Sequence, residues 1–290
     1  MHIVVCVKTV PNPALPAEFD ADRGIFVKDN WNYVLNPHDE IALEQAVRLK
    51  EKYGGTISVI TADSERSTEI LKKCLALGAD KAVRVEPGGL TLDDSLTIAK
   101  MLHRVINQMP YDLIICGDRS DRNCGEVGVM LAELLGLPAV TAITGLEISG
   151  DFGSAVVYKK LEKGAREKKR CPLPALFTAD MMLCEPGYPT LPGRLKAQQK
   201  DIEVIIVGTS QSEPDRLLPD KHYTRLISVN RPPPKKIFIP AGNLSPAERI
   251  RQLTQRTAVK SSSGNILEGN PEEIAIKVVG FLKEKRLLPE

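Results

Sequence analysis

The segment from Gly117 to Gly136, GDRSDRNCGEVGVMLAELLG, has the residue types and spacing of an anion-binding turn. It follows an apolar stretch, residues 112–116, that predicts a strand, and it leads directly into an amphipathic helical pattern. The first amides of a helix lack intrahelical partners and the helix dipole adds partial positive charge, so a phosphate can bind there. Gly125 and Gly128 would let a ligand approach the backbone closely, so a nucleotide site is predicted at residues 123–128.

The same segment has a second interpretation that involves no ligand. Gly117 would then form only a turn, and Gly125 and Gly128 would be only positions at which a helix packs closely. The segment by itself is compatible with both interpretations. Other chemistry finds less support, because Ser120 and Asp121 have no nearby His and the chain has no G-x-S-x-G elbow for a hydrolase triad.

The elements that would position this segment begin with a strand at residues 3–7. A Pro- and Asp-rich excursion follows at residues 11–30, which we expect to be a loop or a small hairpin. Asn36-Pro-His-Asp39 then predicts a helix start, with Asn36 as the cap, Pro37 in the first turn and Asp39 reaching back as in a capping box. The predicted core side of this helix consists of Ile41, Ala42, Ala46 and Leu49.

Further strand and helix patterns alternate along the chain. Strands are predicted at residues 56–61, 82–85 and 113–116. One intervening helix bears Ile70, Leu71, Cys74 and Leu75 and ends at Gly78, and the next is capped by Asp93 or Asp94 and bears Leu96, Ala99, Leu102, Val105 and Ile106. Because β-α-β units build parallel sheets, we expect a Rossmann-like α/β fold with helices on both faces.

Four loops should meet at the carboxyl edge of such a sheet, where ligands of open α/β proteins bind. They are residues 7–13, 36–39, 61–63 and 118–128. The first strand is not followed by G-x-G-x-x-G, so the dinucleotide fingerprint of a hydride-transfer dehydrogenase is absent from the sequence.

Composition narrows the class of protein further. The 290 residues include 39 Lys and Arg against 37 Asp and Glu, a balance that disfavours a nucleic acid or an anionic membrane as partner. The six cysteines form no C-x-x-C, and the four histidines have no ligand at metal spacing, so neither disulfides nor a metal site is expected. The basic run 159–170 is interpreted as a solvated hairpin. With no signal peptide and no long apolar run, a cytoplasmic protein is expected.

Several blocks in one order resemble the β subunits of electron-transfer flavoproteins, the FixA-like family, from the first strand to about Val207. These blocks are VCVKTV at 5–10, NPHDEIALEQA at 36–46, ALGAD at 76–80, DRNCGEVG at 121–128, PALFTAD at 174–180 and LCEPGYPTLP at 183–192. The resemblance implies an adenine-nucleotide α-hydrolase-like fold. It also implies that this subunit binds AMP, or a second FAD in electron-bifurcating members, and pairs with an α subunit that holds a redox FAD.

By resemblance, particular residues would line the nucleotide pocket. They are Cys6, Asn36, Pro37, His38, Asp39, Ala62, Asp121, Asn123, Cys124, Gly125, Glu126, Val127 and Gly128. The family usually has Asp, then Thr or Cys, and later Gln where this chain has Asn123, Cys124 and Glu126. A carboxylate at Glu126 would repel a phosphate unless it points away or an arginine compensates. Bifurcating members tend to carry Asp-Gly-Asp-Thr where this chain has residues 121–124, which favours AMP and leaves a second FAD open.

The resemblance also implies two protein-facing segments and no catalytic side chain. Leu183, with Met182 and Glu185 beside it, corresponds to an anchor loop that binds a dehydrogenase or a quinone-reductase-type redox partner. The loop of Val10, Pro11, Asn12 and Pro13 would approach the flavin shared with the α subunit. Without the resemblance, Leu183 would instead be interpreted as covering the core beneath a Pro-rich turn.

The organisation of the chain changes after residue 207. We expect residues 1–207 to form the nucleotide-binding domain and residues 208–290 to form a C-terminal arm, with a helix starting at Pro271, that packs on the domain itself or on the α subunit. An alternative function is that of a nucleotide-binding protein of the universal-stress-protein type without a redox role. Its Gly-x-x-Gly-x-x-Gly spacing is not reproduced by Gly117, Gly125 and Gly128.

Overall fold

The computed structural model describes residues 1–12, 14–15, 19–20, 25–26, 31–88, 92, 94–120, 125–207, 245–255 and 269–284. The chain forms two compact units, Met1–Arg231 and Pro232–Glu290. The candidate site lies within the first of these units. Pro13, Asp121, Asn123 and Cys124, which were predicted to be near the nucleotide or the flavin, lie outside the described residues.

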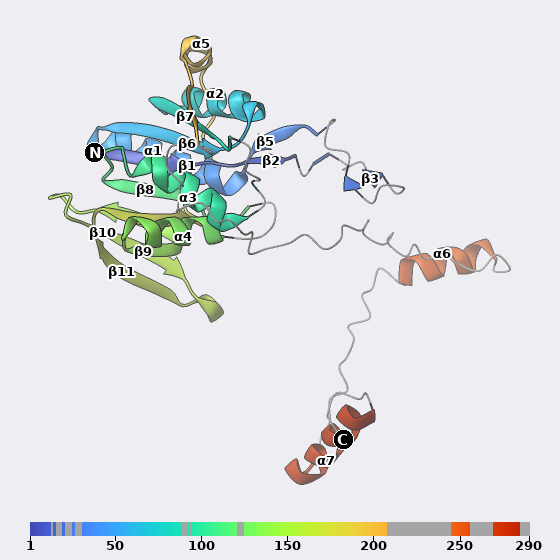
Figure 1. Ribbon diagram of the computed structural model, residues 1–290. Helices are drawn as coiled ribbons and strands as arrows, with labels where there is room; N and C mark the ends of the chain where they lie inside the picture. Colours follow the sequence, from blue (N-terminus) through green and yellow to red (C-terminus); the bar gives the residue numbers. More distant parts are fainter. Residues whose placement is uncertain are drawn as a thin grey trace. The chain divides into compact units, whose positions relative to one another are not determined.

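A nine-stranded sheet forms the centre of the first unit, in the order β11-β10-β9-β12-β8-β1-β6-β7-β13 (Figure 1). The strands are β1 (His2–Cys6), β6 (Thr56–Ala62), β7 (Lys81–Glu86), β8 (Leu113–Gly117), β9 (Ala139–Ile148), β10 (Ser154–Lys160), β11 (Arg166–Pro172), β12 (Ala175–Ala179) and β13 (Glu203–Ile206). Neighbours from β9 through β13 pair in parallel, as predicted for the α/β fold. β10 pairs antiparallel with β9 and β11, which confirms a hairpin at the basic run.

Helices cover both faces of the sheet because successive residues of each strand point to opposite sides. In β1, Ile3 and Val5 pack with residues of α1 (Pro37–Tyr53) and α2 (Thr68–Leu77). Val4 and Cys6 pack with residues of α3 (Ser95–Ile106) and α4 (Glu126–Leu135). The predicted core side of α1 is confirmed, because its four named residues are all buried.

The described helix ends follow from local chemistry. The Asp94 side chain caps α3 by accepting a hydrogen bond from the amide of Thr97. Gly78 ends α2 with a φ of 129°, a backbone conformation that residues with a side chain rarely adopt. Both features agree with the predicted helix boundaries. A 3₁₀ turn, η1 (Glu65–Ser67), leads into α2, and a second, η2 (Glu162–Gly164), lies at the tip of the β10–β11 hairpin.

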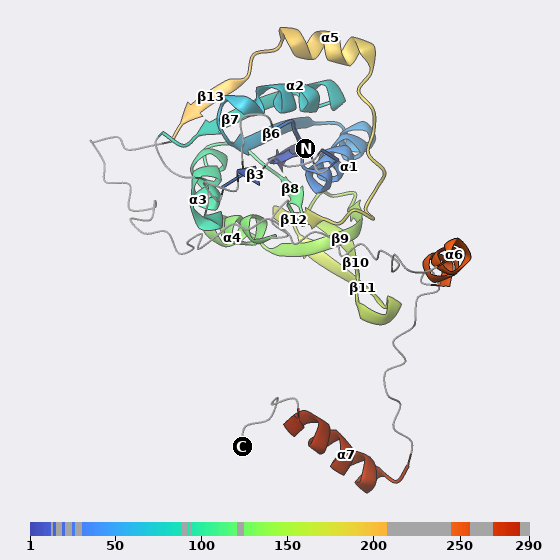
Figure 2. The same cartoon turned by 90° about the vertical axis from the view of Figure 1, so that its right-hand side faces the viewer.

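Short segments complete the first unit. β2 (Thr9–Pro11) pairs with β5 (Tyr33–Leu35), and β3 (Phe19–Asp20) pairs with β4 (Ile25–Phe26), so the excursion after β1 contains the small hairpin that was one of the two expected forms. After β12, the chain reaches α5 (Leu191–Gln199), which packs on α2, and then β13 pairs with β7 at the far edge of the sheet (Figure 2).

The second unit contains α6 (Pro246–Gln255) and α7 (Pro271–Glu284). Ser245 and Glu248 form a capping box at the start of α6, with the Glu248 carboxylate accepting from the Ser245 amide at 3.0 Å. The predicted helix at Pro271 is confirmed, and its side chains Ile276, Val279 and Phe281 are exposed. No helix within the described ranges is both long and apolar enough to cross a membrane.

Candidate functional site

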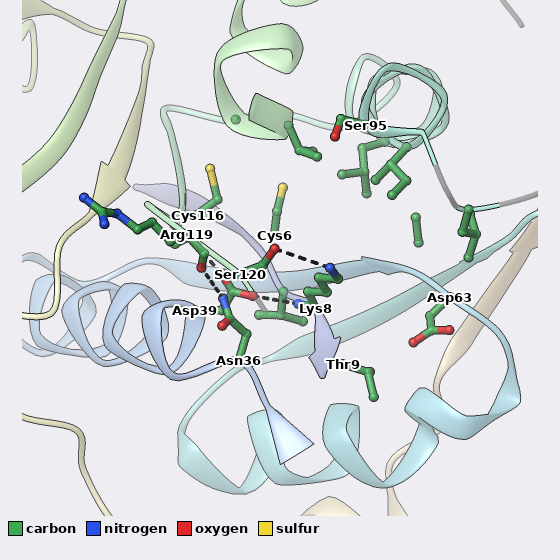
Figure 3. A pocket seen from close by; sticks show the side chains of 18 of the residues that line it. Cys6, Lys8, Thr9, Asn36, Asp39, Asp63, Ser95, Cys116, Arg119 and Ser120 are labelled. Atoms are coloured by element: carbon green, nitrogen blue, oxygen red, sulfur yellow. Dashed lines mark hydrogen bonds between the residues drawn. The ribbon is translucent and has the colours of Figure 1, made fainter. Parts of the chain in front are cut away.

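A pocket of about 430 Å³ lies at the carboxyl ends of β1, β6 and β8 (Figure 3). Its wall contains residues from the strand ends and from the starts of two helices: Cys6–Thr9 at the end of β1, Ala62 and Asp63 at the end of β6, Cys116, Gly117, Arg119 and Ser120 at the end of β8, Asn36 and Asp39 at the start of α1, and Glu126–Gly128 at the start of α4. These segments are far apart in the sequence, and all four loops that were predicted to meet contribute to this one pocket. Its volume falls within the roughly 300–1,000 Å³ typical of small-ligand sites.

The pocket forms here because the strand order changes direction. The chain leaves β1 through α1 and adds β6 and then β7 on one side of β1, after which α3 returns it to β8 on the other side. α1 and α3 therefore lie on opposite faces of the sheet, and the ends of β1 and β8 are left open between them. Cys6 and Cys116, which are directly paired in these two strands, form part of the pocket wall.

Asp39 connects the two strand ends. Its carboxylate accepts a 2.7 Å hydrogen bond from the amide of Lys8, after β1, and a 2.9 Å hydrogen bond from the amide of Gly117, at the end of β8. The side chain of Asn36 donates to the carbonyl of Arg119 at 2.8 Å. The start of α1 thus fixes the loops on both sides of the open strand ends.

This arrangement corrects the prediction of a capping box at the start of α1. Asn36 precedes the helix, but its side chain makes no cap hydrogen bond. The oxygens of Asp39 are already bonded to the amides of Lys8 and Gly117. Those amides come from other segments of the chain, and hydrogen bonding to them satisfies buried donors that no local cap could reach.

Burial shifts the proton affinity of the groups beneath the pocket. Asp39 is 5% exposed, and burial raises the pKa of its carboxyl to about 7 even though the hydrogen bonds from Lys8, Asn36 and Gly117 and the charge of Lys8 oppose the shift. Burial, and secondarily Asp39, raises the pKa of the Cys6 thiol to about 12. Burial also raises the pKa of the Cys116 thiol well above its usual value. Both thiols are therefore neutral at pH 7 and act as a small apolar floor.

The start of α4 forms another part of the wall. Gly125 immediately precedes the helix, and Glu126, Val127 and Gly128 form its first turn, so their amides lie at the pocket. The Glu126 side chain is exposed, whereas Gly128 is buried. A Cβ placed on Gly128 would lie 2.8 Å from Cys116 Sγ, so close helix packing requires glycine there. The packing interpretation of Gly128 therefore holds whether or not a ligand binds.

Other wall residues were not identified as site residues from the sequence. Ser95, Ile98 and Leu102 of α3 enter the wall, together with Thr9 and Arg66. The helical pattern of α3 predicted Leu102 as a core residue, and no spacing signal distinguishes a pocket-lining helix face from a core face. Thr9 is a different case, because it lies within the loop that was predicted to approach the pocket.

The hydroxyl group of Thr9 is a candidate contact for a ligand. The residue is 5% exposed and lines the pocket, and its hydroxyl has no hydrogen-bond partner within the described part of the chain. Buried polar groups in proteins are nearly always paired, so a buried hydroxyl in a pocket wall is a ready partner for a polar ligand.

Lys8 and Arg66 both line the pocket and carry positive charge. The Lys8 ammonium donates to Ser120 Oγ at 3.3 Å. Arg66 pairs with the buried Asp63 at 2.8 Å, so its charge is offset locally. The pocket therefore combines a lysine, the amides at the start of α4, an unpartnered hydroxyl and an apolar wall, which suits a ligand with an anionic end and an apolar ring.

The predicted site residues divide into three groups. Those that line the pocket are Cys6, Pro11, Asn36, Asp39, Ala62, Gly125, Glu126, Val127 and Gly128. Those that are described but do not line it are Val10, Asn12, Pro37 and His38. Pro13, Asp121, Asn123 and Cys124 lie outside the described residues.

The segment after β12 contains the predicted partner loop. Leu183 is half-buried and packs against the core cluster on the α1 side of the sheet, whereas Met181 and Met182 are 49% and 57% exposed. Glu185 is exposed, and its carbonyl accepts a hydrogen bond from Arg48 of α1 at 3.1 Å. The loop therefore presents its methionines to solvent and holds Leu183 against the domain.

The fold and the pocket define an α/β protein whose main pocket among the described residues lies at the switch point of a mostly parallel sheet. The family model of the electron transfer flavoprotein domain matches residues 24–209. The chain belongs to this family, among proteins named as its β subunits.

Relatives from distant organisms agree with this assignment. The chain is 35% identical over 275 residues to the electron transfer flavoprotein subunit beta of Bacillus subtilis (strain 168), covering 92% of this chain and 95% of that protein. It is 34% identical over 212 residues to the human subunit beta, covering 72% and 82%. It is 29% identical over 261 residues to the subunit from Thermoanaerobacterium thermosaccharolyticum, covering 88% and 97%.

Proposed function

We propose that this chain is the β subunit of a heterodimeric electron-transfer flavoprotein, binds an adenine nucleotide in the pocket, and pairs with an α subunit that shares its FAD. The subunit would take part in electron transfer between a dehydrogenase and an acceptor. The family assignment supports the electron-transfer role, and the name "subunit beta" of its relatives supports the pairing.

The observation that carries the nucleotide proposal is the composition of one pocket. Its wall includes the first amides of α4, the unpartnered hydroxyl of Thr9 and the ammonium of Lys8, beside the apolar side chains Ile98 and Leu102. Donors of this kind suit a phosphate, and apolar side chains suit a purine ring. The residues present therefore fit an adenine nucleotide.

Within this proposal, each part of the chain has a defined role. The amides at residues 126–128 bind the phosphate, which requires the exposed Glu126 side chain to turn away from the anion. Asn36 and Asp39 bind no phosphate directly. They hold the loops after β1 and β8 at the separation that the ligand requires, through the hydrogen bonds to Lys8, Gly117 and Arg119.

The chain supplies no bond-making side chain in this proposal. Flavin, when bound, supplies the redox chemistry. The loop of Val10, Pro11, Asn12 and Pro13 approaches the flavin that is shared with the α subunit, and Leu183 with Met182 and Glu185 positions a dehydrogenase or quinone-reductase-type partner. Residues 208–290 form an arm that packs on this domain or on the α subunit.

The ligand can be identified by extraction. The heterodimer would be purified under native conditions and denatured, and AMP and FAD would be counted against protein. One AMP and one FAD per heterodimer is the expected result, whereas two FAD molecules would show that this subunit binds the second flavin. A heterodimer with no nucleotide beyond one FAD would refute the pocket assignment, and a chain that purifies with ATP and without an α subunit would favour the universal-stress-protein alternative.

Thermal melting tests the nucleotide separately from electron transfer. A ligand that binds only the folded state stabilises it, by roughly 2.7 kcal/mol at about 100 times its dissociation constant. Adding AMP to heterodimer stripped of its nucleotide should therefore raise the melting temperature. An unchanged melting temperature at saturating AMP and FAD would show that the nucleotide does not stabilise the heterodimer.

A further inference from the structure

The hairpin of β10 and β11 concentrates the positive charge of the chain. Residues 159–170 contain seven Lys or Arg residues and two Glu residues, a net charge of +5. The whole chain has a net charge of +2, so all other residues together sum to −3. The hairpin is therefore a local basic feature on a chain that is otherwise slightly acidic.

The strand register separates these charges onto two faces. Lys160 pairs with Arg166, Tyr158 with Lys168, and Val156 with Arg170, so four cations share one face. We call Lys160, Arg166, Lys168 and Arg170 the basic face; all four are exposed.

The opposite face is nearly neutral. Lys159 pairs across the strands with Glu167, and Lys169 forms a 3.1 Å ion pair with Glu167. The Lys159 ammonium donates to Thr141 Oγ1 at 3.1 Å. On the basic face, the acidic side chain contributed by β9 is Glu147, which accepts from the Tyr158 hydroxyl at 3.4 Å, and Glu162 lies at the hairpin tip. The two faces of one hairpin thus differ strongly in charge.

The basic face is continuous with the exposed methionines of the partner loop. The Lys160 ammonium lies 4.0 Å from Met182 Sδ. The loop is held beside β9, the strand next to β10, because the amide of Asp180 donates to the carbonyl of Ile143 at 3.1 Å. Exposed methionines can adapt to different apolar surfaces, and Met182 lies directly beside Lys160 at the end of the basic face.

We propose that the basic face and Met182 form one docking surface for an acidic surface of the redox partner that carries an apolar contact at its edge. This inference rests on the proposed electron-transfer function. The cations raise the rate of encounter with an acidic partner, and the methionine supplies the desolvated contact at the edge of the patch. Charged side chains on an edge strand also prevent edge-to-edge aggregation, but that role would be served equally by either face of the hairpin.

Two lysine pairs on the same hairpin provide a matched comparison. Lys160→Gln/Lys168→Gln removes two charges from the basic face, and Lys159→Gln/Lys169→Gln removes two from the opposite face. Each pair would be made in the intact heterodimer, with size-exclusion chromatography and melting as controls. The rate of electron transfer would be measured from the dehydrogenase that reduces the wild type, and the binding of poly-L-glutamate would be measured directly.

The proposal predicts a difference between the two variants. In about 0.01 M salt, where charges act over about 30 Å, the Lys160/Lys168 variant should be reduced roughly fivefold more slowly than the wild type, and the difference should vanish in about 1 M salt. Poly-L-glutamate should bind the wild type and the Lys159/Lys169 variant and bind the Lys160/Lys168 variant several-fold more weakly.

Other outcomes overturn the proposal. If both variants changed the electron-transfer rate equally, or if the Lys160/Lys168 variant aggregated without a change in rate, the charges would serve only to prevent edge-to-edge aggregation. Dissociation of the Lys160/Lys168 heterodimer would assign the face to the α subunit, and binding of RNA or of phosphatidylglycerol vesicles in place of poly-L-glutamate would assign it to another class of partner. If no dehydrogenase reduces the wild type, the proposed function fails, and poly-L-glutamate binding alone then decides whether the basic face recognises acidic protein.

Discussion

The carboxylate of Asp39, at the start of α1, accepts a 2.9 Å hydrogen bond from the amide of Gly117, at the end of β8. A Cβ on Gly117 would collide with Asp39 and with His38, so the close approach of the two segments depends on glycine at this position. With its second bond, to Lys8, Asp39 joins the ends of two strands that flank the switch point. One buried carboxyl group therefore holds the two strand ends that form part of the pocket wall.

The first prediction concerns the pH dependence of this contact. Because burial raises the pKa of Asp39 from 3.8 to about 7, its contribution to stability is complete below pH 3.8 and is lost as the pH rises through about 7. The free energy of unfolding of the wild type, relative to that of Asp39→Asn, should therefore fall between pH 4 and pH 7. Urea denaturation of both proteins across this range measures the difference, and a difference that is independent of pH would contradict the shift.

The second prediction concerns Gly128. Gly128→Ala should destabilise the chain by about 1–3 kcal/mol, because its new Cβ would overlap Cys116 Sγ and press on Thr178 Cγ2 at 3.0 Å. Cys116→Ala removes the closer atom, so the double variant should lose less stability than the sum of the two single variants. A double-mutant cycle by chemical denaturation measures this coupling. If the stability losses of the two single variants added exactly, the new Cβ would not contact Cys116, and α4 would have shifted away from the sheet instead.

The same geometry makes Gly128→Asp unsuitable as a test of nucleotide binding. A larger side chain at this position collides with the sheet before it reaches a ligand, so loss of nucleotide in that variant would not separate binding from folding. Variants at Thr9 provide a cleaner test of the pocket.

The third prediction concerns the unpartnered hydroxyl. Thr9→Val keeps the shape of the side chain and removes a hydroxyl that has no hydrogen-bond partner within the described residues. Stability without nucleotide should therefore change little, while AMP affinity should fall roughly fivefold to tenfold if the ligand bonds to this group. Isothermal titration of the stripped heterodimer gives the affinity.

The matched control for this variant is Thr97→Val. Thr97 is also buried, but its hydroxyl donates to Asp94 at 3.2 Å, so its removal should reduce stability and leave AMP binding nearly unchanged. Unchanged AMP affinity in Thr9→Val would mean that the hydroxyl does not contact the nucleotide.

The fourth prediction concerns the partner loop. Leu183→Ala should slow electron exchange with the dehydrogenase about tenfold while flavin content stays intact, with a stability loss of about 1 kcal/mol because the side chain is half-buried. Leu146→Ala is the control, since Leu146 is partly buried against the same cluster from β9. Stopped-flow rates and flavin absorbance measure the effects. Loss of both exchange and flavin in Leu183→Ala would assign Leu183 a folding role.

The sheet and the meeting of its loops could be predicted because they depend on patterns that are local in the chain. Strands such as residues 113–116 and the core side of α1 have clear periodicity, and the carboxyl-edge rule then brings the loops together. The hydrogen bonds of Asp39 could not be predicted in this way, because its donors lie at residues 8 and 117 and only the folded chain places them together.

The sequence also could not show which side chains line the pocket or face the domain, and the reason is physical. Ile98 and Leu102 have the helical spacing of a core face. They line a pocket because this face of α3 lies next to the open ends of the strands. Likewise, the sequence around Leu183 predicts a turn but does not say which side chain faces the domain. The structure places Leu183 inward and the two methionines outward.

β13, the parallel strand at one edge of the sheet, is the last strand described in the first unit. β13 pairs Glu203 with Val83 of β7, a partner synthesised long before it, and the chain reaches β13 only after α5 has crossed α2. During synthesis on the ribosome, β7 therefore has an uncovered edge until almost the whole domain has emerged. A nascent chain that stalls before residue 203 would expose this backbone edge to chaperones or to other nascent chains.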